Sequence, residues 1–152
     1  MANITILWSI MLIFFGIMAS IIDIKTKKVP NSLILIMFTA WFITMIPMLF
    51  INSQEATFVF FDSCLGLMLG GGLFLLVYII SSRGLGGGDV KFMAAAGLYL
   101  GLYGVIPAMF LGSALAALTV LILLLFKKIK RKDTIPLIPF LSVGMIAAVL
   151  LR

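Results

Sequence analysis

The sequence predicts an all-α integral membrane protein, a single membrane-embedded domain over residues 1–152 with six transmembrane helices. Of the 152 residues, 64% are hydrophobic and 11% are charged, and the mean hydropathy is +1.32. A soluble domain carries about 25% charged residues. The apolar residues form long runs that contain no charged residue except Asp62, and the lysines and arginines fall between alternate runs. Six spans of roughly 20 residues would leave only about 30 residues for loops.

Five apolar runs supply the predicted helices. The first, second and third are Ile4–Ile22, Leu33–Ile51 and Phe58–Ile80, and the last is Ile135–Leu151. The fourth, Phe92–Phe126, has 35 residues. As one helix it would be about 52 Å long, against a hydrocarbon core of about 30 Å. We therefore expect it to fold as two spans.

The break in the long run is predicted at Gly101–Pro107, where two glycines and a proline interrupt the pattern. Gly66 with Gly70, and Gly97 with Gly101, are pairs of small residues four apart, a spacing that suits close helix packing in membranes.

The basic residues predict the orientation. Six spans place all but Arg152 on one side, which the positive-inside rule identifies as the cytoplasm. Both termini are then expected outside the cytoplasm. The basic residues on the shared side are Lys25, Lys27, Lys28, Arg83, Lys91, Lys127, Lys128, Lys130, Arg131 and Lys132.

The composition excludes several kinds of site. The chain has no histidine, which removes HExxH zinc sites and Ser-His or Cys-His catalytic pairs. Its one cysteine, Cys64, is expected to be a small buried hydrophobe and allows neither an internal disulfide nor a CxxC metal site. We therefore expect no metal and no cofactor. The net charge of +6 reflects topology and anionic lipid headgroups, so the expected partner is the bilayer and not nucleic acid.

Three of the five acids have plain interpretations. Glu55, in a predicted outer loop at Asn52–Thr57, and Asp133, in a basic cytoplasmic loop, are expected to be solvated. Asp62 lies about one turn into the third span, where it can reach water or headgroups; the alternative is a buried functional acid.

Asp23 and Asp89 are predicted at the cytoplasmic rim, at the end of the first span and the start of the fourth. Two carboxylates that share one site cannot both ionise cheaply, so one keeps a proton while the other deprotonates water. This pairing suits aspartic proteolysis, with neither role assigned to a particular residue. The alternatives are a helix N-cap for Asp89 and an interfacial residue paired with lysines for Asp23.

A glycine-rich segment, Gly84-Leu-Gly-Gly-Gly-Asp89, precedes the second acid. Glycines there would admit water and let an extended substrate approach the backbone, or would simply form a flexible turn. A phosphate-binding loop is excluded because no Gly-Lys-Ser/Thr ending follows. Lys91 is interpreted either as a residue that assists the site or as a topology charge.

These segments together resemble the type IV prepilin peptidases, a family of GxGD intramembrane aspartic peptidases. Gly86-Gly-Gly-Asp89 matches the GxGD motif, and Lys91 extends it to GxGDxK. Asp23-Ile-Lys-Thr-Lys-Lys-Val-Pro-Asn31 is similar to the family's first-aspartate motif, and Pro136-Leu-Ile-Pro-Phe-Leu141 to its late Pro-x-x-Pro-Phe-Leu segment.

The resemblance implies an aspartic endopeptidase of the cytoplasmic (inner) membrane of a prokaryote. Such enzymes cut the short basic leader from type IV pilin-like precursors at the cytoplasmic face, without a metal. It implies that Asp23 and Asp89 are catalytic. The residues implied to bind substrate or support the motifs are Gly86, Gly87, Gly88, Lys91, Pro30, Asn31 and Lys25.

The chain also departs from the family pattern. It has neither the length nor the cysteines of the N-terminal methyltransferase segment, so we expect a short form without methylation, similar to Flp/Tad-pilus peptidases. Ile138 stands where a glycine is common, and Val29 where isoleucine is usual. Pro30 and Asn31 could also form a plain turn and the N-cap of the second span.

The alternative function is a non-catalytic polytopic membrane protein, either a pilus or secretion assembly factor or a small transporter. A transporter is expected to hold its acids near the bilayer midplane. The rim position of Asp23 and Asp89 favours the peptidase.

Overall fold

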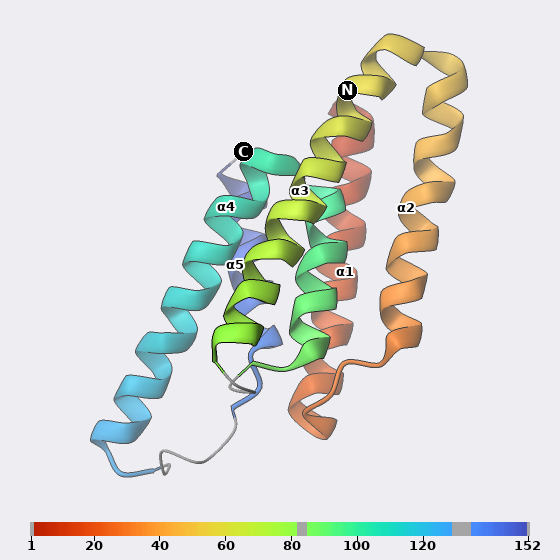
Figure 1. Cartoon of the computed structure of the whole chain (residues 1–152). Coiled ribbons are helices and arrows are strands. Elements are labelled where there is room, and N and C mark those ends of the chain that lie inside the picture. Colours follow the sequence, from red (N-terminus) through yellow and green to blue (C-terminus); the bar gives the residue numbers. More distant parts are fainter. Residues whose placement is uncertain (1, 82–84, 129–134, 152) are drawn as a thin grey trace.

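The computed structural model describes residues 2–81, 85–128 and 135–151, and these residues form helices joined by short connections (Figure 1). The first four helices are long and apolar enough to cross a membrane, and the fifth is a shorter apolar helix. The prediction of an all-α membrane protein is therefore confirmed. The helices are α1 (Ala2–Thr26), α2 (Asn31–Ile51), α3 (Ser53–Ile80), α4 (Gly87–Leu125) and α5 (Ile138–Leu150).

The long helix α4 contains a break at Gly101, the first residue of the segment in which the sequence predicts one. Gly101 has φ 65° and ψ −177°, which is not helical, whereas Pro107 continues within the helix. Glycine tolerates this positive φ because it has no Cβ. In Figure 1 the two halves of α4 run in opposite directions beside α3. α4 also contacts every other helix.

Glycines let α3 and the first half of α4 approach backbone to backbone. A Cβ on Gly66 would overlap the carbonyl oxygen of Gly97, and a Cβ on Gly97 would overlap the carbonyl oxygen of Gly66. A Cβ on Gly70 would lie 2.7 Å from the carbonyl oxygen of Met93. Apolar side chains gain little by leaving lipid, so close packing of this kind contributes much of the attraction between membrane helices.

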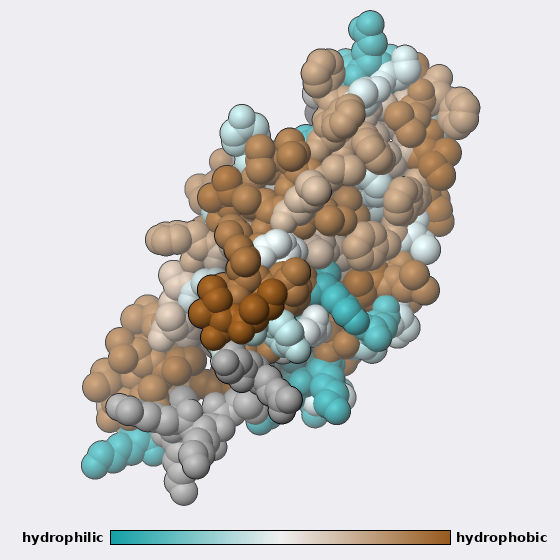
Figure 2. Space-filling model, in the orientation of Figure 1, coloured by the Kyte–Doolittle hydropathy of each residue, from teal (hydrophilic) through white to brown (hydrophobic). Residues whose placement is uncertain are grey.

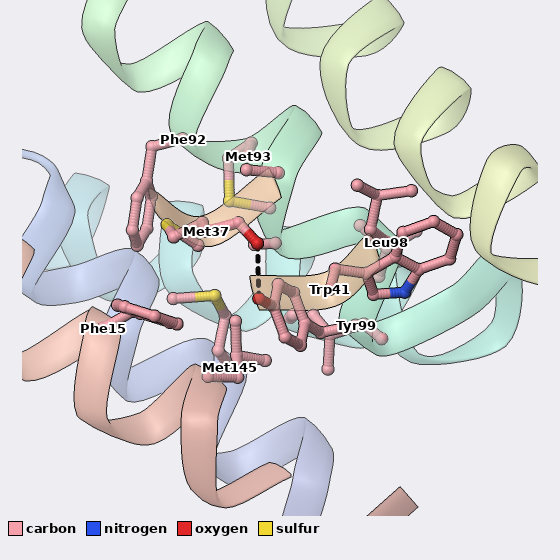
Figure 3. Close-up of a cluster of buried hydrophobic side chains, with 14 of the residues drawn as sticks. Phe15, Met37, Trp41, Phe92, Met93, Leu98, Tyr99 and Met145 are labelled. Atoms are coloured by element: carbon pink, nitrogen blue, oxygen red, sulfur yellow. Dashed lines mark hydrogen bonds between the residues drawn. The ribbon is translucent and has the colours of Figure 1, made fainter. Parts of the chain in front are cut away.

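Large side chains fill the centre of the bundle (Figure 3). Within it the Tyr99 hydroxyl donates a hydrogen bond of 2.6 Å to the Met37 carbonyl oxygen and ties α4 to α2. The Trp8 ring lies 5.8 Å from that of Trp41, and its Nε1–H donates to Thr44 Oγ1 at 2.9 Å. The core residues labelled in Figure 3 are Phe15, Met37, Trp41, Phe92, Met93, Leu98, Tyr99 and Met145.

The outer surface of the bundle is mainly apolar. Hydrophobic residues cover most of the face shown in Figure 2, and much of the hydrophilic surface gathers toward its lower part. Large side chains such as Phe14, Ile43, Phe61 and Phe110 are exposed. This surface fits contact with lipid chains rather than with water.

Three details differ from the sequence expectations. No outer loop spans Asn52–Thr57: α3 begins at Ser53, and Glu55 lies exposed in its first turn, where an acid is favourable to the helix dipole. α5 begins at Ile138 rather than residue 135, because Pro139 belongs to its first turn. Cys64 is free but only half-buried.

Some residues named in the sequence predictions lie outside the described residues. These are Gly84, Arg83, Lys130, Arg131, Lys132, Asp133 and Arg152.

Candidate active site

Asp23 lies inside the last turn of α1, which continues three residues beyond it to Thr26. Its side chain is buried, with 4% of its surface exposed. Its Oδ2 accepts a hydrogen bond of 3.1 Å from the backbone N–H of Ile138. The first N–H groups of a helix have no partner within that helix, so the start of α5 offers a donor to this carboxylate.

The connection after α1 turns the chain sharply toward α2. Lys27 adopts the left-handed conformation with φ 52°, and its N–H donates to the Asp23 carbonyl oxygen at 2.7 Å. A residue in this conformation commonly ends a helix, and a proline often follows. Here Pro30 precedes α2 with φ −68° and ψ 136°. The turn holds Val29 and Pro30 between the two helices.

Asp89 lies in the first turn of α4. Its backbone N–H donates to the Gly86 carbonyl oxygen at 3.1 Å, and its Oδ2 accepts from the Gly86 N–H at 3.2 Å. The alternative that Asp89 is the N-cap residue is wrong, because Gly86 holds that position and Asp89 is the third helical residue. Its carboxylate still caps the helix by satisfying a free N–H. Asp89 is half-buried.

The fold brings the segments that carry Asp23 and Asp89 to the same end of the bundle. α1 and α4 are in contact, and Gly88, the residue before Asp89, packs against Val29 in the turn that follows α1. Both carboxylates also accept a backbone N–H at the start of a helix. Two acids at one end of the bundle, each held by a backbone donor, are the candidate pair.

Two contacts join the segments that carry the acids. Lys91 Nζ donates a hydrogen bond of 3.0 Å to Asn31 Oδ1, which links the start of α4 to the start of α2. The alternative of Asn31 as a side-chain N-cap is wrong, because Asn31 is already helical and Pro30 holds the cap position. A Cβ on Gly88 would lie 3.1 Å from the Val29 Cβ, so the glycine backbone packs against the turn that follows α1.

The three glycines before Asp89 have different surroundings. A Cβ on Gly86 would lie 3.0 Å from Asp89 Oδ2, whereas a Cβ on Gly87 would meet no atom within 4 Å. Gly86 and Gly88 therefore have little room for a side chain, whereas position 87, the x of GxGD, has room for one. Lys25 is exposed in the last turn of α1, and no residue that the structure describes bonds to its side chain.

Sequence reasoning missed the partner of Asp23. The Ile138 side chain is fully buried while its N–H reaches the carboxylate, so an isoleucine is compatible with this position. Nearby, Ser142 Oγ donates to the Gly16 carbonyl oxygen at 3.0 Å and accepts from Ser20 Oγ at 2.9 Å, which fastens α5 to α1. The Pro-x-x-Pro spacing marks where α5 starts, but no signal in the sequence pairs that start with Asp23.

Two carboxyl groups can supply both a general base and a general acid. A carboxylate can accept a proton from water, and a neighbouring carboxyl group can donate one to a leaving group. Within residues 2–81, 85–128 and 135–151, no three His, Cys, Asp or Glu side chains gather as metal ligands.

Comparisons with known proteins identify the family. The chain finds no match among curated proteins or solved structures. The sequence model of the type IV leader peptidase family matches residues 10–126. The match includes both acids and their glycine and Pro-Asn segments, and it ends before the late proline segment. Since it covers more than half of the sequence, the chain belongs to the type IV leader peptidase family.

Proposed function

We propose that this chain is an aspartic endopeptidase that removes the short basic leader from type IV pilin-like precursors. The observation that carries the proposal is that Asp23 and Asp89, in a member of a leader peptidase family, stand on contacting helices at one end of the bundle, where Gly88 packs against Val29. The substrate is a prepilin-like membrane protein, and the enzyme acts at the cytoplasmic face of a prokaryotic inner membrane.

The proposed reaction is hydrolysis of one peptide bond. One carboxylate takes a proton from water, and the water oxygen adds to the peptide carbonyl carbon. The other carboxyl group, in its protonated form, stabilises the carbonyl oxygen and then supplies a proton to the leaving amine as the C–N bond breaks. Carboxyl groups that share one site titrate as a pair, so the proposal assigns neither role to Asp23 or Asp89 alone.

The residues around the pair support this chemistry. The Ile138 N–H and the Gly86 N–H each hold one carboxylate oxygen in place. The Lys91–Asn31 bond and the contact of Gly88 with Val29 hold the two acid-bearing segments in register. Gly87 has no side chain, and a Cβ there would meet no atom within 4 Å, so an extended substrate has room beside this backbone.

The proposal includes six membrane crossings with both termini outside the cytoplasm. A straight helix of 39 residues would be about 58 Å long at about 1.5 Å per residue, well beyond a core of about 30 Å. The break at Gly101 supports two crossings within α4. This topology puts both acids on the lysine-rich side, where a basic leader would be cut.

Single cysteines test the topology. In a Cys64→Ser background, Asn52→Cys is expected to react with an impermeant maleimide added outside cells, and Lys128→Cys only after the membrane is opened. Both positions are exposed. External labelling of Lys128→Cys would reverse the proposed orientation.

Co-expression with candidate prepilins tests the activity. Asp23→Asn and Asp89→Asn keep an oxygen that can accept the Ile138 or Gly86 N–H, but they cannot act as carboxylates. Each is expected to slow leader removal by about 10²–10⁴-fold, the usual contribution of a general acid or base. Glu55→Gln, which removes an exposed acid far from the pair, is the matched control. Product mass and a gel shift report cleavage, and immunoblotting reports protein level.

The outcomes separate the proposal from its rival. Cleavage by the wild type and Glu55→Gln, lost in either aspartate variant at equal protein level, supports the two-aspartate mechanism. Continued cleavage by both aspartate variants would reject it. Intact precursors with the wild type, across several plausible pilins, would favour a non-catalytic assembly factor.

A further inference from the structure

A second polar feature lies at the end of the bundle opposite the paired aspartates. A cavity of about 200 Å³ is lined by the starts of α1 and α3 and the end of the first half of α4. This volume is far above the about 10–15 Å³ that one water needs. Phe58, on its rim, is 76% exposed, so the cavity meets the surface. Its lining residues are Ile4, Thr5, Trp8, Phe58, Val59, Asp62, Ser63, Tyr99 and Gly101.

Asp62 is the charged residue of this cavity. Its Oδ1 accepts a hydrogen bond of 3.1 Å from the Leu102 N–H, at the point where α4 resumes after Gly101. Within the part of the chain that the structure describes, no lysine or arginine bonds to Asp62. The lysines in that part follow Asp23, begin α4 or follow α4, all at the other end of the bundle (Figure 1). A carboxylate within a membrane span calls for a positive partner.

The other walls favour an organic cation over a metal ion. Trp8 and Tyr99 are each 3% exposed and form the inner wall, and Phe58 forms the rim. Aromatic faces attract cations, and aromatic cages that bind ammonium groups are a recurrent use of this attraction. A hard metal ion needs six or more oxygen ligands. Here the oxygen-bearing side chains that line the cavity are one carboxylate, Asp62, and three hydroxyl residues, Thr5, Ser63 and Tyr99, and the Tyr99 hydroxyl already donates to the Met37 carbonyl oxygen.

From this we infer that the cavity is a binding site for an organic ammonium group, with Asp62 as its counter-ion and the aromatic residues as its wall. Its position near the start of two membrane helices favours the ammonium of a phospholipid headgroup, such as phosphatidylethanolamine, as the source. A free amine has the same chemistry. The inference stands apart from leader cleavage, because the cavity and the catalytic pair lie at opposite ends of α1.

Retention of lipids by the purified protein tests the site. The protein is equilibrated with equal amounts of phosphatidylethanolamine and phosphatidylglycerol that carry the same acyl chains, and bound lipid is counted by native mass spectrometry. Asp62→Asn removes the charge and keeps an oxygen for the Leu102 N–H. Glu55→Gln, which removes an exposed acid at the same end but outside the cavity, is the matched control.

We expect the wild type and Glu55→Gln to retain phosphatidylethanolamine preferentially. Asp62→Asn should lower that retention about tenfold, equivalent to about 1.4 kcal/mol, and leave phosphatidylglycerol unchanged. Competition by free ethanolamine or choline, without preference for the lipid, would assign the ammonium to a soluble amine. Should Asp62→Asn fail to fold, Phe58→Leu is measured in its place. Unchanged phosphatidylethanolamine retention by Phe58→Leu would then overturn the inference.

Equal retention of the two lipids by the wild type, with no effect of free amines, would also overturn the inference. So would preferential retention that survives Asp62→Asn. Leader cleavage by Asp62→Asn measures the proposed peptidase independently, so failure of one proposal leaves the other intact.

Discussion

Replacing Gly101 with alanine should destabilise the fold. Some glycines of α3 and α4 have room for a Cβ without overlap of backbone atoms, and among these we expect Gly101→Ala to cost the most. Gly101 has a positive φ of 65°, and a Cβ there would overlap the Asp62 carboxylate. The carboxylate would have to move, and it would lose the hydrogen bond of 3.1 Å that it accepts from the Leu102 N–H. The substitution therefore disturbs both the backbone and its polar support.

The magnitude follows from these two contributions. A non-glycine residue at positive φ with ψ near 180° costs about 1–3 kcal/mol. Loss of a hydrogen bond to a charged group costs roughly 1.5–3 kcal/mol. Together Gly101→Ala should lower the free energy of unfolding by roughly 2.5–6 kcal/mol. In an Asp62→Ala background the overlap is gone, and only the backbone cost of about 1–3 kcal/mol should remain.

Unfolding in mixed micelles measures this cost through tryptophan fluorescence. Trp8 and Trp41 are 3% and 1% exposed, so their emission reports on tertiary packing. Gly72→Ala is the matched control, since its Cβ would meet nothing within 4 Å, and it should be neutral or slightly stabilising. If Gly101→Ala and Gly72→Ala agreed within about 0.5 kcal/mol, the reasoning about the break would be refuted.

Two further predictions concern the catalytic end. Lys91→Met should slow leader cleavage several-fold because it removes the hydrogen bond between α4 and α2. Lys128→Met, which removes an exposed lysine at the same end, should not slow cleavage. Equal rates in the two variants would favour the interpretation of Lys91 as a topology charge. Gly88→Ala should slow cleavage by displacing the turn after α1, and Gly87→Ala, with open space around its Cβ, should cleave as the wild type does. Both pairs are compared by initial cleavage rate at equal protein level, and a slower Gly87 variant would contradict the second prediction.

Much of the candidate site could be predicted from local sequence. Asp23 and Asp89 stand out because they interrupt or border apolar runs, and the glycines before Asp89 are dense enough to be seen without a structure. The contacts between these segments could not be predicted in the same way. For Asn31 the sequence leaves open a role in the motif and a helix cap, and only the packing of α2 beside α4 makes its side chain an acceptor for Lys91.

Asp62 shows the same limit at the other end of the bundle. Its position near the end of a span suggested a solvated acid, yet its partner is the Leu102 N–H, freed because Gly101 leaves the helical conformation. The glycines and Pro107 marked the segment in which α4 breaks. The register of α3 against α4 decided which carboxylate faces the break.

The sequence by itself determined that this protein is a helical membrane protein, because apolar length and the spacing of charges are properties of one segment at a time. It also determined which acids stand at span ends and which glycines accompany them. Only the tertiary structure decided that Asp23 is held by the Ile138 N–H, which comes 115 residues later, and that Gly88 beside Asp89 packs against the turn after α1. Such pairings depend on how helices distant in sequence rotate and slide against one another, and no local pattern along the chain specifies that register.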